Sequence, residues 1–364
     1  MLGKEPRRAV LLWLGLFAIL CAGAASAWIW PRNKIAPPKP LLHEQIVTGG
    51  CGPVLSPDGR VYFTADMDDL GQSGQLYNCM LDGTCERRVR ITPPERYAFE
   101  RGGMTFSTNP SRCFFAYYIL GVAECFGEGV LEAPDRLHIL VRDIPGVIGD
   151  RAFVSRDSRL CFHLTRVSGR HLNCALSAID STGSLGPPLW FADPPIDSQY
   201  YSCDWAPNSN RFAFVDIGSR GRFMGDKGSP LYVLDLKRRV LTDKYLLPGV
   251  RVSGVAWSPD GRWIAFHVSD VRVNSVSQPD SPMINAVCVL DLASGRTWRL
   301  SRCDNRPQWT PDMAYLVYDW YGYILRLDWR RALADTAVEV PMMHTRLVCK
   351  PQPQASARKG AVTR

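Results

Sequence analysis

A ten-residue hairpin motif recurs six times along this chain at a nearly constant spacing. The copies are "LSPDGRVYFT" from residue 55, "FSTNPSRCFF" from 106, "VSRDSRLCFH" from 154, "WAPNSNRFAF" from 205, "WSPDGRWIAF" from 257 and "WTPDMAYLVY" from 309. The Asp or Asn at the fourth position of each copy follows the previous one after 51, 48, 51, 52 and 52 residues. A period near fifty residues with several strands per unit is typical of a β-propeller.

Each copy predicts a tight turn between two short strands. In the fifth copy, Ser258, Pro259, Asp260 and Gly261 suit the four positions of a type I β-turn, because proline already has the φ that the second position needs. A second strand pair follows in most repeats, as in "VCVLDLASGRTWRLS" from residue 287. Four strands make one blade, so we expect an all-β chain folded as a six-bladed propeller.

An aromatic residue precedes the turn in four of the six copies, namely Phe106, Trp205, Trp257 and Trp309. Blades of a propeller stack face to face, so we expect these rings to wedge between neighbouring blades and to bury on the order of 150–250 Å² each. Hydrophobic residues make up 46% of the chain, which is enough for such a core.

The hairpin "WSPDG" with "IAF", followed by "LYVLDL" and a closing strand such as "RTWRLS", resembles the repeat of TolB-type β-propellers. The resemblance covers essentially residues 44–349. It implies a six-bladed propeller whose central channel mouth binds partner proteins or peptides. TolB proteins also carry a separate N-terminal α/β domain, whereas here the proline-rich stretch 31–43 leads from an apolar segment to the first repeat.

Two segments compete to close the ring. "HEQIVTG" at 43–49 precedes the first hairpin much as "RTWRLS" precedes the sixth, and it could supply the outermost strand of the last blade. "TAVEV" at 336–340 could take the same place. An unpaired edge strand would invite aggregation, so we expect one of the two to close the ring.

The N-terminal segment predicts export. Positive charges lie between residues 4 and 8, and residues 9–30 are apolar. Residues 25–27 suit cleavage of a signal peptide, but the apolar run is also long enough to span a bilayer, and we favour an uncleaved anchor. Both interpretations place everything after Pro31 in the periplasm, anchored to the inner membrane or released by cleavage.

The sequence therefore divides into an anchor or signal at 1–30, a proline-rich linker at 31–43, a propeller at 44–349 and a basic disordered tail at 350–364. The net charge of +8 comes from the ends, which hold ten of the 43 basic residues and one of the 35 acidic residues. A nucleic-acid partner requires basic residues clustered on the folded body, so we expect none.

The chain contains 12 cysteines, which is ordinary for an exported protein because disulfides persist there. Predicted hairpin turns place Cys161 near Cys174 and Cys79 near Cys85, so we expect these two disulfides. Cys113–Cys125 is a third expected pair. No CxxC motif occurs, so the usual zinc and thioredoxin spacings are absent.

If the hairpin turns lie on one face of the ring, the other connections gather on the opposite face, the loop face. Long or glycine-rich connections are expected there at 66–75, 119–136, 216–230 and 269–285. Arg and Tyr are enriched at protein interfaces. The partner-binding candidates on this face are Arg96, Tyr97, Arg101, Tyr200, Tyr201, Arg251, Arg302, Asp304, Asn305 and Arg306. The alternative is a solvated surface whose arginines pair with nearby acids.

Catalytic motifs are absent from the sequence. It has no GxSxG elbow and no HExxH, so we expect no enzyme and no cofactor. A calcium site at Asp66, Asp68 and Asp69 is a weak alternative, since calcium prefers several carboxylates on one short loop. The favoured function is a non-catalytic, membrane-tethered scaffold for a protein or peptide partner. A glycan-active or glycan-binding propeller and a structural subunit of a membrane complex are the alternatives.

Overall fold

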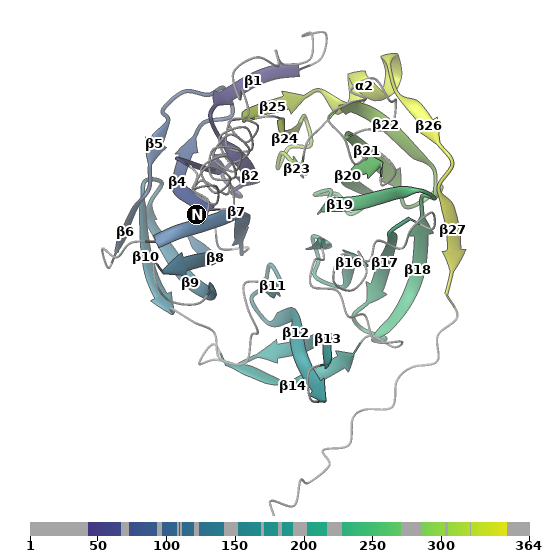
Figure 1. Cartoon of the computed structure of the whole chain (residues 1–364), viewed down its shortest axis with the longest axis horizontal. Helices are drawn as coiled ribbons and strands as arrows, with labels where there is room; N and C mark the ends of the chain where they lie inside the picture. The colour runs from purple at the N-terminus through teal and green to yellow at the C-terminus, as the bar shows by residue number, and fades with distance from the viewer. Residues whose placement is uncertain are drawn as a thin grey trace, which may run out of the picture. The chain divides into compact units, whose positions relative to one another are not determined.

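The computed structural model describes residues 43–347, except 67–72, 93–96, 108, 110, 120–123, 142–151, 169–170, 181–183, 192–201, 217–227, 271–284, 303–304 and 321. The described strands form six antiparallel blades in a ring, which confirms the expected all-β six-bladed propeller (Figure 1). The predicted anchor, most of the linker and the basic tail lie outside the described residues. No helix among the described residues is long and apolar enough to cross a membrane.

The blades follow one another along the chain. Blade 1 contains β2 (Cys51–Leu55), β3 (Val61–Ala65), β4 (Ser73–Cys79) and β5 (Arg87–Arg88). Blade 2 contains β7 (Tyr97–Phe106), β8 (Arg112–Ile119), β9 (Glu124–Ala133) and β10 (Arg136–Val141), with β6 (Arg90–Thr92) parallel to β10. Blade 3 contains β11 (Ala152–Val154), β12 (Leu160–Ser168), β13 (His171–Ile179) and β14 (Leu185–Phe191).

The second half of the ring is built in the same way. Blade 4 contains β15 (Cys203–Trp205), β16 (Arg211–Val215), β17 (Pro230–Asp235) and β18 (Val240–Leu246). Blade 5 contains β19 (Val250–Trp257), β20 (Trp263–Asp270), β21 (Ala286–Asp291) and β22 (Thr297–Arg302). Blade 6 contains β23 (Asn305–Trp309), β24 (Leu316–Trp320), β25 (Tyr323–Leu327) and, from the start of the propeller, β1 (His43–Thr48).

Residues near the start of the propeller close the ring. β1 pairs antiparallel with β25, and the pairing begins at His43 opposite Leu327. The Arg326 Nε donates a hydrogen bond to the Glu44 carboxylate at 2.7 Å. The Gly52 amide of blade 1 donates to the Asp319 carboxylate of blade 6 at 2.9 Å. The segment 43–49 therefore supplies the outer strand of the last blade.

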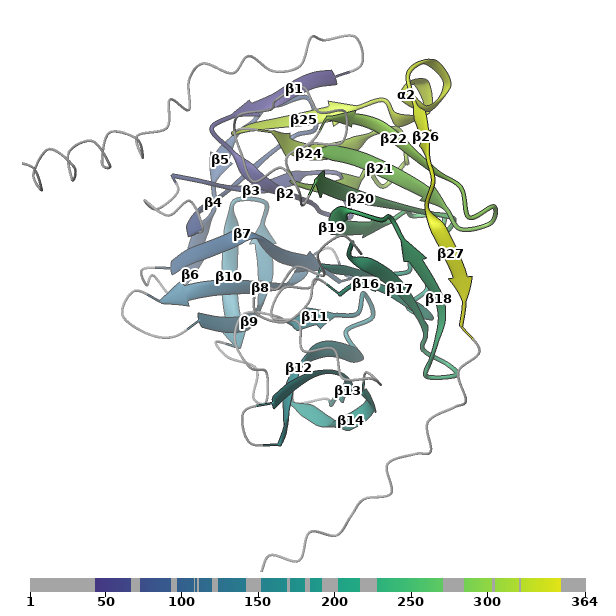
Figure 2. The ribbon, with the colours of Figure 1, turned by 45° about the vertical axis from the view of Figure 1, so that its right-hand side comes forward.

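The competing segment 336–340 instead turns back along the outside of the ring. Helix α2 (Trp329–Asp335) follows β25, and Asp328 caps it by accepting a hydrogen bond from the Arg331 amide. β26 (Val338–Val340) then pairs with β22, and β27 (Met343–Arg346) pairs with β18 (Figure 2). We name residues 328–346 the C-terminal clasp, because its strands become the fifth strands of blades 5 and 4.

The aromatic residues before the turns pack between blades, as expected. Trp205 and Trp257 are each 1% exposed, and Phe106 and Trp309 are also buried. Trp257 packs among residues of blades 4 and 5, and Trp309 among residues of blades 5 and 6. These rings are therefore part of the core that joins one blade to the next.

The three predicted disulfides are wrong, because the strand registers separate the cysteines. Cys161 lies opposite Ser177, three residues from Cys174, so the two thiols point to opposite faces of blade 3. Both are buried, and burial raises the pKa of Cys161 to about 12.

The other two pairs fail for similar reasons. Cys79 is buried, whereas Cys85 is exposed at a turn position with φ +57°. Cys113 is free and lies opposite Gly129, while Cys125 lies opposite Tyr117. The long connection expected at 119–136 is also wrong, since β9 fills most of it.

Candidate functional site

Three of the innermost strands contain a β-bulge or a similar irregularity before the turn. The registers of β2, β19 and β23 shift before the turn, between Cys51 and Val54 in the first of them. Gly52 and Gly254 have φ +59° at this bulge, and Arg306 has φ +42° at the same repeat position. A side chain held in the left-handed region costs on the order of 1–3 kcal/mol, and such residues occur at functional sites as well as in tight turns.

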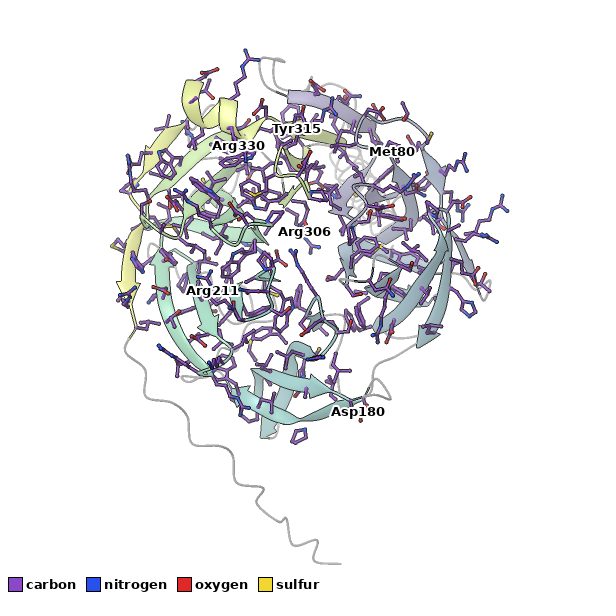
Figure 3. The ribbon with its side chains drawn as sticks, turned by 180° about the vertical axis from the view of Figure 1, so that it is seen from behind. Met80, Asp180, Arg211, Arg306, Tyr315 and Arg330 are labelled. Atoms are coloured by element: carbon purple, nitrogen blue, oxygen red, sulfur yellow. The ribbon has the colours of Figure 1, made fainter. Side chains whose placement is uncertain are left out.

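Close packing between neighbouring bulges explains the backbone at this position. A Cβ added to Gly254 would lie 2.7 Å from both the Cα and the amide nitrogen of Arg306. Blade 5 therefore needs glycine here, whereas blade 6 can carry an arginine beside the central opening of the ring (Figure 3).

An axial cavity of about 390 Å³ lies inside the innermost strands, and all six blades contribute to its wall. Four turn prolines line one end, namely Pro57, Pro207, Pro259 and Pro311. Pro57 and Pro311 are exposed, so the cavity reaches the surface at the turns. Apolar side chains such as Met104 and Phe153 line it further along, as do the polar groups described next.

Asp204 is the acidic group of the cavity, and its side chain is 24% exposed. One carboxylate oxygen accepts a hydrogen bond from the Trp257 amide at 2.6 Å, and the other accepts from the Trp205 amide at 2.8 Å. Burial raises the pKa of Asp204, and the charge of Arg156 and the two backbone hydrogen bonds oppose that shift. Asp204 thus holds blade 5 against blade 4.

Among the described residues that line the cavity, two arginines carry positive charge. An Arg156 Nη2 lies 3.9 Å from the Asp204 carboxylate, beyond hydrogen-bond distance, and the Arg156 side chain is 32% exposed. Arg306 is half-buried and lines the same cavity. Within the described part of the chain, Arg306 has no hydrogen bond or ion pair. Both guanidinium groups therefore retain donors for a ligand.

Of the ten predicted partner-binding residues, Arg306 lines the cavity. Arg251 lies half-buried on β19 and is not part of the cavity wall. The rest cannot be placed as side chains. The backbone alone is described for Tyr97, Arg101, Arg302 and Asn305, and Arg96, Tyr200, Tyr201 and Asp304 lie outside the described residues.

The alternative calcium site cannot be assembled from the described residues. Asp66 accepts a hydrogen bond from the Tyr77 hydroxyl at 2.6 Å, and Asp68 and Asp69 lie outside the described residues. In the part of the chain that the structure describes, no three His, Cys, Asp or Glu residues gather in a way that could hold a metal ion.

The charged residues of the cavity stand where the repeats depart from their own pattern. Arg156 replaces the turn proline found in four other copies, and Asp204 stands before Trp205, where the other copies have uncharged residues. Arg306 stands where the fifth repeat has Gly254. Sequence reasoning missed Arg156 and Asp204 because it used what the six copies share and did not ask where a single copy departs from the others. A position-by-position alignment of the six copies would have singled them out.

The sequence matches no protein-family model and no curated protein. Among solved structures, a protein assigned as TolB from Agrobacterium tumefaciens is 14% identical with a TM-score of 0.50, over 77% of this chain and 90% of that one. TolB from Acinetobacter baumannii is 13% identical with a TM-score of 0.46, over 78% of this chain. The match spans 64% of the Acinetobacter protein.

The expectation that the chain is not an enzyme needs correction. The same propeller fold is found in an oligogalacturonate lyase from Vibrio parahaemolyticus, at 14% identity and a TM-score of 0.45, over 80% of this chain and 92% of that one. A propeller can assemble a site from single residues of several blades, so missing linear motifs do not exclude catalysis. At these identities the comparisons define the fold alone, and the described part of this chain is a TolB-like six-bladed β-propeller.

Proposed function

We propose that this protein is an exported propeller that binds a protein or peptide partner through its axial cavity. The observation that carries the proposal is the cavity itself, about 390 Å³ in volume, open at the turns and lined by polar and apolar groups in similar measure. Binding sites in proteins generally have volumes of this order, with a small number of polar groups that fix the orientation of the ligand. The strained backbone at Arg306 supports the same position.

Export to the periplasm and membrane tethering belong to the proposal through the N-terminal segment. Its positive residues followed by the apolar run at 9–30 support them. The loop face lies opposite the turns at which the cavity opens. Its predicted residues, among them Arg96 and Arg251, are proposed as a second contact, since a protein partner covers more surface than one cavity provides.

Site-specific photo-crosslinking in the producing cell tests this proposal. A benzoylphenylalanine at Pro57 or Pro311, at the exposed rim of the cavity, should crosslink to one discrete protein or peptide species. The matched control is the same residue at Met80, which is 37% exposed and belongs to the first repeat like Pro57. Equal crosslinking from Met80, or no discrete product from either rim position, would refute binding through the cavity.

A further inference from the structure

The described charged groups of the axial cavity sum to an excess of positive charge. Arg156 and Arg306 contribute two cations, and Asp204 contributes the single carboxylate. Both oxygens of Asp204 already accept backbone hydrogen bonds, from the Trp205 and Trp257 amides. The carboxylate is therefore largely satisfied by the protein, and the guanidinium donors remain.

The donors that remain suit an incoming carboxylate. A guanidinium carries five N–H groups in a planar fork that matches the two oxygens of a carboxylate. Arg156 approaches Asp204 only to 3.9 Å, so it keeps its hydrogen-bond donors. Such charge-assisted pairs are the strongest hydrogen bonds available to a ligand, and partial exclusion of water from the cavity strengthens them further.

We propose that the axial cavity recognises a peptide carboxylate, held between Arg156 and Arg306 with an apolar side chain of the peptide against the turn prolines. This inference rests on the proposed function and specifies its ligand. The wall contains both polar and apolar groups, and we favour a peptide over an acidic sugar because Met104, Phe153 and the four prolines offer an apolar contact to an aliphatic side chain. The hydroxyl groups of a sugar would lose hydrogen bonds with water there, whereas an aliphatic side chain would gain burial.

Two pools of N-acetylated pentapeptides test the inference with the detergent-solubilised full-length chain. The pools share one randomised set of sequences and differ only in ending with a free carboxylate or with an amide. Affinity selection with mass-spectrometric readout should enrich members of the acid pool and leave the amidated pool unenriched. Trigalacturonate serves as the acidic-sugar probe.

Arginine variants link the selection to the cavity. Arg156→Gln and Arg306→Gln should each lower the affinity for an enriched peptide at least tenfold, as measured by calorimetry. The matched control Arg159→Gln should leave affinity unchanged, because Arg159 is exposed in the same turn as Arg156 and does not line the cavity. If Arg306→Gln fails to fold, Arg306→Lys keeps the charge without the fork and should still lose affinity.

Enrichment of both pools alike, enrichment of neither, or unchanged affinity of the arginine variants would overturn the carboxylate inference. Binding of trigalacturonate without any peptide would move the site to acidic sugars. A discrete crosslink from Pro57 in the absence of peptide-acid binding would leave the proposed function standing, whereas loss of both would remove the function as well.

Discussion

Blade 5 and blade 3 are built from the same repeat, yet they differ in nearly every feature that holds a blade in place. Blade 5 has a full "SPDG" turn, an entirely buried β21 and a fifth strand from the clasp. Blade 3 has a three-residue inner strand, an arginine in its turn and four strands among its described residues. The blade that keeps the repeat carries the packing, and the blade that departs from it brings charge to the axis.

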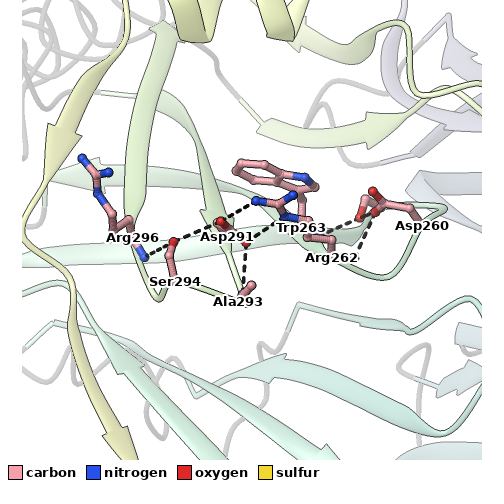
Figure 4. A network of polar contacts seen from close by, with 8 residues as sticks. Asp260, Arg262, Trp263, Asp291, Ala293, Ser294 and Arg296 are labelled. Carbon is pink, nitrogen blue, oxygen red and sulfur yellow. Dashed lines mark hydrogen bonds and ion pairs between the residues drawn. The ribbon is translucent and has the colours of Figure 1, made fainter.

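The turn and the outer hairpin of blade 5 are joined by one buried carboxylate. Asp291, 4% exposed, accepts hydrogen bonds from Arg262 Nη2 at 2.9 Å and from the Ala293 amide at 3.0 Å (Figure 4). The Arg262 hydrogen bond, the largest cause, holds the pKa of Asp291 below its usual value. Asp291 therefore couples the two hairpin turns that lie side by side at one end of blade 5.

The largest expected effect is a difference in folding stability between core substitutions in blade 5 and in blade 3. Trp257→Ala should lower the free energy of unfolding by about 4 kcal/mol, because removal of a ring that is packed between blades 4 and 5 leaves a cavity. The half-buried Phe153 of blade 3 provides the comparison, and Phe153→Ala should lower the free energy of unfolding clearly less than Trp257→Ala does. Urea unfolding of both variants measures the difference. Equal losses would contradict the idea that blade 5 carries more of the packing.

A smaller loss should follow from the buried carboxylate of blade 5. Asp291→Asn should lower the free energy of unfolding by roughly 2 kcal/mol at pH 7. The pKa of Asp291 in the folded state lies below its value of about 4 in the unfolded state. The stabilisation by the Asp291 carboxylate is therefore complete above pH values of about 4 and declines as the pH falls. Unfolding at pH 7 and at pH 3 should show a smaller difference between the variant and the wild type at pH 3 than at pH 7. A gap that stays constant would show that the charge of Asp291 does not matter.

Charge at the axis should affect binding and leave folding intact. Arg306→Glu should lower the affinity for the partner at least tenfold, equivalent to about 1.4 kcal/mol, with little change in melting temperature. Arg96→Glu and Arg251→Glu test whether the loop face shares the contact. Co-purification with the partner is the measurement. Release by Arg96→Glu or Arg251→Glu but not by Arg306→Glu would locate binding on the loop face instead of the cavity.

The smallest effect concerns the end of the clasp. All four residues of β27 are exposed, so truncation after Met342 should lower the free energy of unfolding by about 1 kcal/mol or less. Trp329→Ala, further back in the clasp, is the contrast, since Trp329 is 3% exposed and its ring centroid lies 4.9 Å from that of Trp309. A truncation as damaging as Trp329→Ala would show that strand pairing, and not the buried tryptophan, anchors the clasp.

The sequence alone determined the blades, because each blade is defined by interactions between residues close together in the chain. In the turns, Ser258 donates to Asp260 at 2.6 Å and Thr310 donates to Asp312 at 2.6 Å, so the chemistry is complete within a few residues. The aromatic that precedes the turn in four of the copies has its place set by the same spacing. Period, turn and aromatic position were sufficient to predict a six-bladed ring.

Only the tertiary structure decided which distant segments meet. The choice between 43–49 and 336–340 depends on pairing β1 with a strand about 280 residues away, and both sequences suit an outer strand. Which cysteines face each other across a hairpin depends on the strand register, and a turn displaced by a few residues changes every pair. Arg156, Asp204 and Arg306 come from three different blades and share one cavity because the ring closes. Local chemistry defines a blade, whereas the geometry of closure defines what faces the axis.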